Sequence, residues 1–146
     1  MKTALLFLFL LPLAGYHSES NLWKADLGEA IESAKADDKQ ILMVFSGSDW
    51  CRPCIKLRQE ILDHSSFQAF AEHELVLLEV DFPRARKNRL PAEQTAKNEA
   101  LAERYNPQGA FPRMVLLEAD QTVLGQIQYL SDDPADLIQQ IKAILP

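Results

Sequence analysis

The sequence predicts an α/β fold in which helices cover both faces of a mixed central sheet. Apolar runs at residues 41–45, 75–80 and 114–117 have the length and composition of buried strands. Stretches with apolar residues at helical spacing separate these runs, which favours parallel pairing of the strands. A short turn at residues 119–121 then leads into a fourth strand, so we expect a closing hairpin with an antiparallel edge.

The length and composition are those of one globular domain. A chain of 146 residues is of ordinary single-domain size. With 47% hydrophobic and 25% charged residues it can bury a core and differs from a disordered chain. The formal net charge is −6, which argues against a nucleic-acid partner and against electrostatic binding to anionic lipid, since both need a net basic face.

The N-terminus has the pattern of a secretory signal peptide. One positive charge at Lys2 precedes an apolar run at residues 4–11, and polar residues begin at His17. The run is shorter than the roughly 20 apolar residues of a membrane span. We therefore expect a signal peptide over residues 1–18 and a domain over residues 19–146 that is exported, periplasmic or secreted, with no stable membrane anchor.

The first part of the domain alternates between helix and strand. Apolar residues recur at helical spacing over residues 26–36 and predict an amphipathic helix. Residues 41–45 are all apolar, as in a central strand that is buried on both faces. Residues 50–54 open the next helix. After a polar interruption at residues 63–66, we expect a short helical stretch over residues 67–72.

A second strand and a third long helix follow. Residues 75–80 form another apolar run and predict a second buried strand. A basic segment at residues 84–89 comes next and leads to Pro91. From there a helix is predicted as far as Tyr105.

The last part of the chain predicts a hairpin and a helix. Residues 114–117 are a third apolar strand. In residues 122–129, Val123 and Ile127 belong to a set of apolar positions that alternate with more polar ones, as in an antiparallel strand with one solvated face. Asp133 is suited to cap a helix, and the proline that follows it is suited to the first helical position. Together they predict the start of the final helix.

The two cysteines form a pair at the predicted start of a helix. A dithiol exchanges with a disulfide when one sulfur attacks as a thiolate and a second is close enough to resolve the mixed disulfide. With Pro53 at the first helical position, Cys51 stands just outside the helix, where free N–H groups and the helix dipole lower a thiol pKa. Arg52 adds positive charge, and Cys54 lies one turn further on the apolar face. We therefore predict that Cys51 attacks and Cys54 resolves.

Two other readings of the cysteine pair are possible. A zinc site would need two more ligands, but there is no second cysteine pair, and His64 and His73 lack the spacing of paired zinc ligands. We accordingly expect no metal and no cofactor. A purely structural disulfide is the stronger alternative, although closing so small a loop would constrain the unfolded chain little.

The cysteine motif resembles the active site of the thioredoxin superfamily, particularly its exported thioredoxin-like members. The motif reads Trp50-Cys51-Arg52-Pro53-Cys54. It follows the apolar strand at residues 41–45, and Phe111-Pro112 precedes a later strand; the resemblance spans about residues 26–145. It implies a thioredoxin-like fold in which Pro112 is the cis-proline beside the dithiol and Phe111 offers its backbone to an extended substrate.

Two features depart from that family. Thioredoxins carry a buried aspartate in the first central strand as a proton relay to the resolving cysteine, whereas Val44 or Phe45 stands at this place here. Glu79 or Asp81 on the next strand are candidates for another route. The segment at residues 83–91 is also longer and more basic than in a minimal thioredoxin, and is either a solvated loop or a determinant of partner choice.

The sequence therefore predicts an exported thiol–disulfide oxidoreductase, working as a reductase or electron relay rather than as an oxidase. Its partners would be protein disulfides or dithiols, and a membrane-borne electron donor is implied because an exported dithiol must be re-reduced in an oxidising compartment. We expect a monomer. The alternatives are a disulfide isomerase or oxidase, and a redox-inert thioredoxin-like binding module whose cysteines form only a structural bond.

Overall fold

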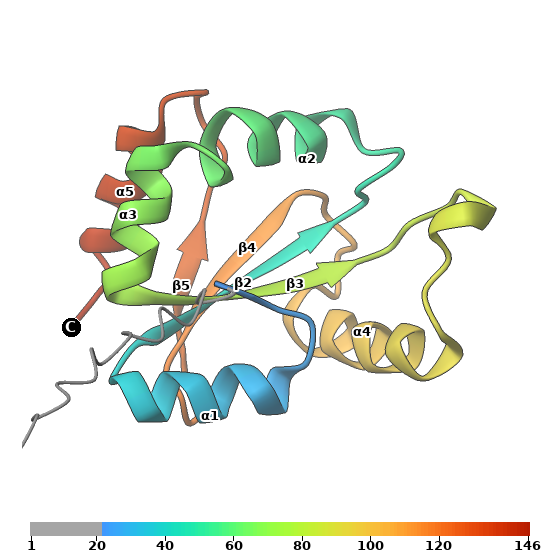
Figure 1. The fold of residues 1–146 in the computed structure, drawn as a ribbon, viewed down its shortest axis with the longest axis horizontal. Helices are drawn as coiled ribbons and strands as arrows, with labels where there is room; N and C mark the ends of the chain where they lie inside the picture. The colour runs from blue at the N-terminus through green and yellow to red at the C-terminus, as the bar shows by residue number, and fades with distance from the viewer. Residues whose placement is uncertain (1–21) are drawn as a thin grey trace, which may run out of the picture.

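A mixed sheet of five strands forms the centre of the computed structural model, which describes residues 22–146; the expected signal peptide lies outside them. The strands are β1 (Trp23–Lys24), β2 (Gln40–Ser46), β3 (Leu75–Asp81), β4 (Arg113–Leu117) and β5 (Val123–Ile127). Their order across the sheet is β1-β3-β2-β4-β5, so β2 is central (Figure 1). The predicted α/β class with a mixed sheet is confirmed.

Helices cover both faces of this sheet. They are α1 (Leu27–Asp37), α2 (Arg52–Leu57), the π-helical turn η1 (Arg58–Leu62), α3 (Ser65–Glu74), the 3-10 turn η2 (Arg86–Asn88), α4 (Ala92–Tyr105) and α5 (Pro134–Lys142). Figure 1 shows α1 and α4 on one face and α2, α3 and α5 on the other.

The central strand supplies side chains to both cores, as its continuous apolar run predicts. Leu42 and Val44 pack in the core under α2, α3 and α5. Ile41, Met43 and Phe45 pack in the core under α1 and α4. All five are buried. Since successive side chains of a strand point to opposite faces, only a strand covered on both sides needs to be apolar throughout.

Two predicted helix starts are confirmed by their caps. The carboxylate of Asp26 accepts a hydrogen bond from the Glu29 N–H at the start of α1. The carboxylate of Asp133 accepts one from the Ala135 N–H, and Pro134 occupies the first helical position of α5. These acceptors satisfy N–H groups that have no partner within the helix.

The pairing of β4 corrects the sequence prediction. β2 and β3 are parallel, as expected, but β4 runs antiparallel to β2 although a helix separates β4 from β3. Long connections flank α4 on both sides, at residues 82–91, which include η2, and at residues 106–112. These connections bring the chain back to the end of the sheet at which β3 finishes. Because β4 starts from that end, it runs in the direction opposite to β3.

The hairpin is confirmed, but its alternation is not the predicted one. Leu116 pairs with Gly125 and Leu117 pairs with Val123, so Leu124 is an extra residue between them. Such a bulge reverses the faces of the residues beyond it. Val123 is consequently 51% exposed, whereas the sequence alternation placed it inward. The two-residue β1, paired in parallel with β3, was not predicted because it is too short to show any periodicity.

Candidate functional site

The two cysteines meet at the start of α2, beyond the end of the central strand. Cys51 is the N-cap residue of α2 and forms a disulfide with Cys54, their Cα atoms being 5.2 Å apart. The Cys54 N–H also donates a hydrogen bond to the Cys51 Sγ at 3.3 Å. Donors of this kind favour the anionic sulfur when the bond is reduced.

The helix starts one residue earlier than predicted. Arg52 is its first residue and Pro53 its second, whereas the sequence reading placed Pro53 first. The shift costs nothing, because none of the N–H groups in the first turn has a partner within the helix. Cys51 still stands just outside the helix. Both sulfur-bearing residues are buried, with 5% of Cys51 and 3% of Cys54 exposed, while Arg52 and Pro53 are exposed.

Trp50 joins the cysteine loop to the segment that resembles the family's substrate site. Its indole Nε1–H donates to the Phe82 carbonyl oxygen at 2.7 Å. Its ring packs edge-on against Phe111 with centroids 5.5 Å apart, and Phe111 packs in the same way against Phe82. The Phe111–Pro112 peptide bond is cis, as the resemblance implied. The tertiary structure thus gathers Trp50, Phe111 and Pro112 around the dithiol.

An open groove runs beside Pro112. Its volume is about 390 Å³. Its lining includes Pro53, Phe111 and Pro112. Gln126 of β5 and Tyr129, two residues after β5, also line it. An extended peptide that reached Cys51 would therefore find both apolar surface and backbone groups alongside it.

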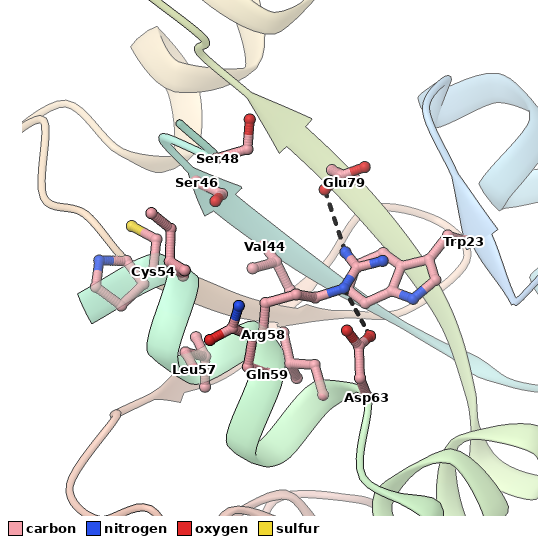
Figure 2. Close-up of a pocket in the computed structure, with 13 residues that line it drawn as sticks. Trp23, Val44, Ser46, Ser48, Cys54, Leu57, Arg58, Gln59, Asp63 and Glu79 are labelled. Atoms are coloured by element: carbon pink, nitrogen blue, oxygen red, sulfur yellow. Dashed lines mark hydrogen bonds and ion pairs between the residues drawn. The ribbon is translucent and has the colours of Figure 1, made fainter. Parts of the chain in front are cut away.

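A second cavity, of about 250 Å³, lies behind Cys54 (Figure 2). Val44, Arg58, Glu79 and Pro112 are among its lining residues. Val44, rather than Phe45, therefore occupies the place facing Cys54, since Phe45 lies in the core on the opposite face of the sheet. Glu79 is the direct neighbour of Val44 across the β2–β3 pair.

Glu79 is the cavity's half-buried carboxylate. Burial raises its pKa, and the nearby Arg58 guanidinium, whose Nη1 is 3.2 Å from the Glu79 Oε1, opposes that rise. Arg58 is itself held by Asp63, with Nε and Oδ1 2.8 Å apart, and by stacking over the Trp23 ring at 4.1 Å (Figure 2). The residues around the cavity thus include a carboxyl group that burial makes a stronger base than an exposed carboxylate.

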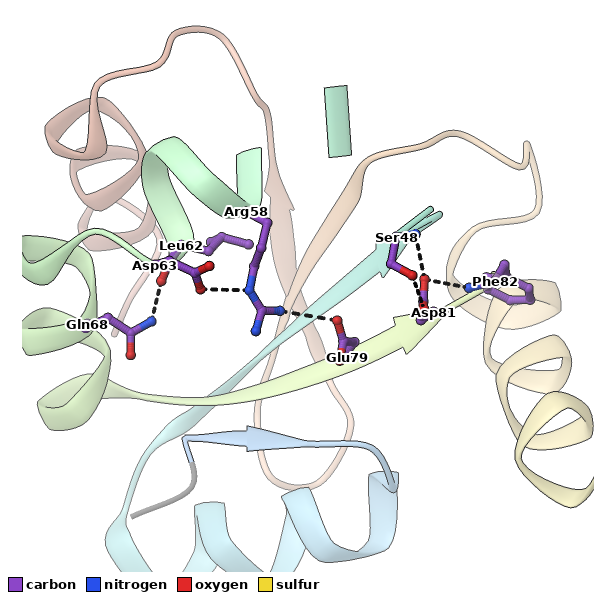
Figure 3. A network of polar contacts seen from close by, with 8 residues as sticks. All are labelled: Ser48, Arg58, Leu62, Asp63, Gln68, Glu79, Asp81 and Phe82. Carbon is purple, nitrogen blue, oxygen red and sulfur yellow. Dashed lines mark hydrogen bonds and ion pairs between the residues drawn. The ribbon is translucent and has the colours of Figure 1, made fainter. Parts of the chain in front are cut away.

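Asp81, the other candidate for proton transfer, is engaged elsewhere. Its carboxylate accepts hydrogen bonds from the Ser48 N–H at 2.9 Å, the Ser48 hydroxyl at 2.6 Å and the Phe82 N–H at 2.9 Å. It does not line the cavity behind Cys54. Figure 3 shows the two carboxylates at separate places along β3. Asp81 fixes the loop before the cysteines, so of the two candidates on β3 it is Glu79 that lines the same cavity as Cys54.

A polar clamp that the sequence did not reveal holds the basic segment against this loop. The Asp49 carboxylate accepts hydrogen bonds from the Arg84 N–H and Ala85 N–H, both at 2.9 Å, and from the Asn88 side chain at 3.0 Å. These hydrogen bonds lower the pKa of Asp49, and the one from the Arg84 N–H has the largest effect. The Arg84 guanidinium also lies 3.7 Å above the Trp50 ring. The contact could not be predicted, because Asp49 is a single aspartate in a polar loop and its partner Arg84 lies 35 residues further along the chain.

Metal-binding clusters and membrane-spanning helices are both absent from the part of the chain that the structure describes. Between residues 22 and 146, no group of three or more His, Cys, Asp or Glu side chains is arranged to hold a metal ion. Within the same residues, no helix has the length and apolar character needed to cross a membrane.

Comparisons with known proteins agree with this geometry. The thioredoxin-like domain family matches residues 27–144. The disulfide bond reductase DsbH of Chlamydia pneumoniae is 38% identical over 126 residues, which cover 86% of this chain and 74% of DsbH. The thioredoxin-related protein DsbJ of the same organism is 31% identical over 75% of this chain, a match that spans 31% of DsbJ. A solved structure of a DsbH oxidoreductase superposes with a TM-score of 0.76 at 33% identity, covering 97% of this chain and 94% of that one.

Proposed function

The chain belongs to the thioredoxin-like family, and we propose that it is an exported thiol–disulfide oxidoreductase that reduces protein disulfides through Cys51 and Cys54. The observation that carries the proposal is the position of Cys51 at the N-cap of α2, within disulfide distance of Cys54 and beside an open groove. The similarity to a disulfide bond reductase supports the reducing direction.

The reaction has two exchange steps. In the reduced protein the Cys51 thiolate attacks one sulfur of a substrate disulfide, the substrate S–S bond breaks, and the departing sulfur takes up a proton. Cys54 then loses its proton and attacks the Cys51 sulfur. The mixed disulfide breaks, the second substrate thiol leaves, and the Cys51–Cys54 disulfide forms. Two electrons have passed to the substrate, and the protein is left in the oxidised state that the structure holds.

Cys51 is the attacking residue in this scheme because of its place at the helix terminus. The Cys54 N–H and the positive end of the α2 dipole stabilise a thiolate at that position. The exposed Arg52 adds positive charge beside it. Cys54 lies within the first turn of the helix, where it can reach Cys51, and it lines the cavity behind the helix rather than the groove beside Pro112.

Glu79 is proposed to take the proton that Cys54 loses in the second step. The two residues line the same cavity, and burial raises the pKa of Glu79, which makes it a better proton acceptor than an exposed carboxylate. This route replaces the aspartate that thioredoxins carry at the position of Val44.

Substrate would lie in the groove beside Pro112. There Phe111 presents its backbone, and the side chains of Pro53 and Tyr129 supply contact area. Because the dithiol is oxidised in each turnover, a protein dithiol must donate electrons to it. In an oxidising compartment such a donor is membrane-borne, which fits the expected export signal at residues 1–18.

The test is reduction of insulin with dithiothreitol as electron source. The protein should accelerate precipitation of the insulin B chain, and the double variant Cys51→Ser/Cys54→Ser should not. A wild-type protein that leaves the rate at the background level would overturn the oxidoreductase proposal and favour a redox-inert binding module.

A further inference from the structure

Residues 82–91, here called the basic arm, form a positively charged surface beside the dithiol. The arm contains four cations, Arg84, Arg86, Lys87 and Arg89, and no acidic residue. All four side chains are exposed. Among the described residues, none of them forms an ion pair. They stand out in a chain whose formal net charge is −6.

The arm is fixed to the active-site loop at three points. Asp49, two residues before Cys51, accepts hydrogen bonds from two arm N–H groups and from the Asn88 side chain. The carbonyl oxygen of Phe82 accepts the Trp50 indole N–H. Arg84 stacks on the same indole at 3.7 Å. A loop held in this way keeps its backbone in a constant position relative to the dithiol, and this confines its cations to one side of the active-site loop.

The arm also contacts the other side of the substrate site. Phe82 packs against Phe111, the residue before Pro112, with ring centroids 5.6 Å apart. A polypeptide that lies along Phe111 and reaches Cys51 must therefore pass close to the arm. Two carboxylates next to the arm, Asp49 and Asp81, are already engaged, because each accepts three hydrogen bonds from nearby donors. Glu99 of α4, which lines the same pocket as Arg89, is the exposed carboxylate on this side of the arm.

We propose that the basic arm is a docking surface for an acidic segment of the partner polypeptide, next to the disulfide that Cys51 attacks. This inference rests on the proposed function and specifies its substrate class. Fixed cations beside a reacting group attract an oppositely charged partner, raise the rate of encounter and lose their effect as salt screens them. A polypeptide is favoured over a lipid surface because the arm is joined to the residues that border the substrate groove.

The experiment compares three synthetic peptides, each closed by one disulfide and differing only in four flanking residues, which are all Glu, all Gln or all Lys. Their reduction by the reduced protein, in a single turnover that leaves the Cys51–Cys54 disulfide, is followed as a second-order rate constant at low and at high salt. The arm variant carries Arg86→Gln, Lys87→Gln and Arg89→Gln, side chains with no hydrogen bond in the fold. The matched variant removes three cations elsewhere, by Lys24→Gln, Lys35→Gln and Lys142→Gln.

In the wild type and the matched variant, the Glu peptide should be reduced about tenfold faster than the Gln peptide at low salt. At high salt the ratio should fall below about twofold. The arm variant should reduce the Gln peptide at the wild-type rate and show no preference for the Glu peptide.

Equal rates for the Glu and Gln peptides in the wild type, or a preference that survives in the arm variant, would overturn the docking surface while leaving the proposed function intact. Equal rates together with arm-dependent sedimentation on phosphatidylglycerol vesicles would overturn it in favour of a lipid surface. Failure to reduce even the Gln peptide would overturn the proposed function and this inference together.

Discussion

A β-carbon at Gly47 would lie 2.3 Å from the indole ring of Trp50, so the loop before the cysteines touches this ring with its bare backbone. The Gly47 carbonyl oxygen also accepts hydrogen bonds from the Trp50 N–H at 3.2 Å and the Cys51 N–H at 2.9 Å. The approach of the chain to Cys51 therefore depends on the absence of a side chain at position 47.

Gly47→Ala should destabilise the protein by about 1–3 kcal/mol, because the added methyl group must displace a packed ring. The shifted ring would also lose its 2.7 Å hydrogen bond to Phe82. Urea unfolding measures the change in free energy. In a Trp50→Ala background the same substitution should cost much less, and an equal cost in both backgrounds would show that the ring is not the obstacle.

The roles of the two cysteines can be separated by trapping. Cys54→Ser should accumulate mixed disulfides with partner proteins, because the attacking Cys51 remains and nothing resolves the intermediate. Cys51→Ser should not accumulate them. Non-reducing gels followed by mass spectrometry detect the adducts and identify the partners. Equal trapping by the two variants would contradict the assignment of Cys51 as the nucleophile.

Glu79→Gln should slow the resolution of the mixed disulfide by about tenfold or more near neutral pH, since a positioned general base commonly contributes 10²-fold or more. In the wild type, resolution should slow as the pH falls through the Glu79 pKa, which burial raises above 4.5, because the protonated carboxyl cannot accept a proton. The variant should lack this inflection. Rapid-quench measurement across pH tests both points, with the exposed Glu60→Gln as control. Matching profiles for Glu79→Gln and wild type would exclude the relay.

Asn98 is a buried polar residue that ties α4 to the end of β3. Its Nδ2 donates to the Asp81 carbonyl oxygen at 2.8 Å, its Oδ1 accepts from Gln94, and only 2% of the residue is exposed. Asn98→Ala should cost about 1–3 kcal/mol, because a buried carbonyl loses its donor. Denaturant unfolding gives the value, and the exposed neighbour Glu99→Ala should change it little. A loss below about 0.5 kcal/mol would mean that water replaces the amide.

The reduction potential should lie in the range of thioredoxins and glutaredoxins, about −270 to −200 mV. Arg52 beside Cys51 favours the thiolate, which makes the reduction potential less negative. Its effect is small because the Arg52 side chain is exposed and its charge is screened. The acidic net charge of −6 acts in the opposite direction. A titration of the dithiol against glutathione or dithiothreitol measures the potential. A value above roughly −150 mV would indicate disulfide formation rather than reduction.

Much of the architecture could be predicted because its signals are local. The all-apolar run around Val44 identified the central strand, and the Asp133-Pro134 pair located the start of α5. The edge strand β1 escaped prediction because two residues are too few to show a pattern. The predicted position of Pro53 in the helix was wrong by one residue, because the first turn of a helix accepts proline at several positions.

The sequence by itself determined the four longer strands, the main helices, the mixed sheet with helices on both faces, and the placement of Cys51 at a helix terminus. Each follows from periodicity or from neighbours within about one helical turn. The tertiary structure alone decided the antiparallel direction of β4, the exposure of Val123 and the choice of Glu79 over Asp81 at the Cys54 cavity. It alone joined Asp49 to the basic arm. These features depend on strand register and chain reversal between distant segments, and local propensity carries no information about either.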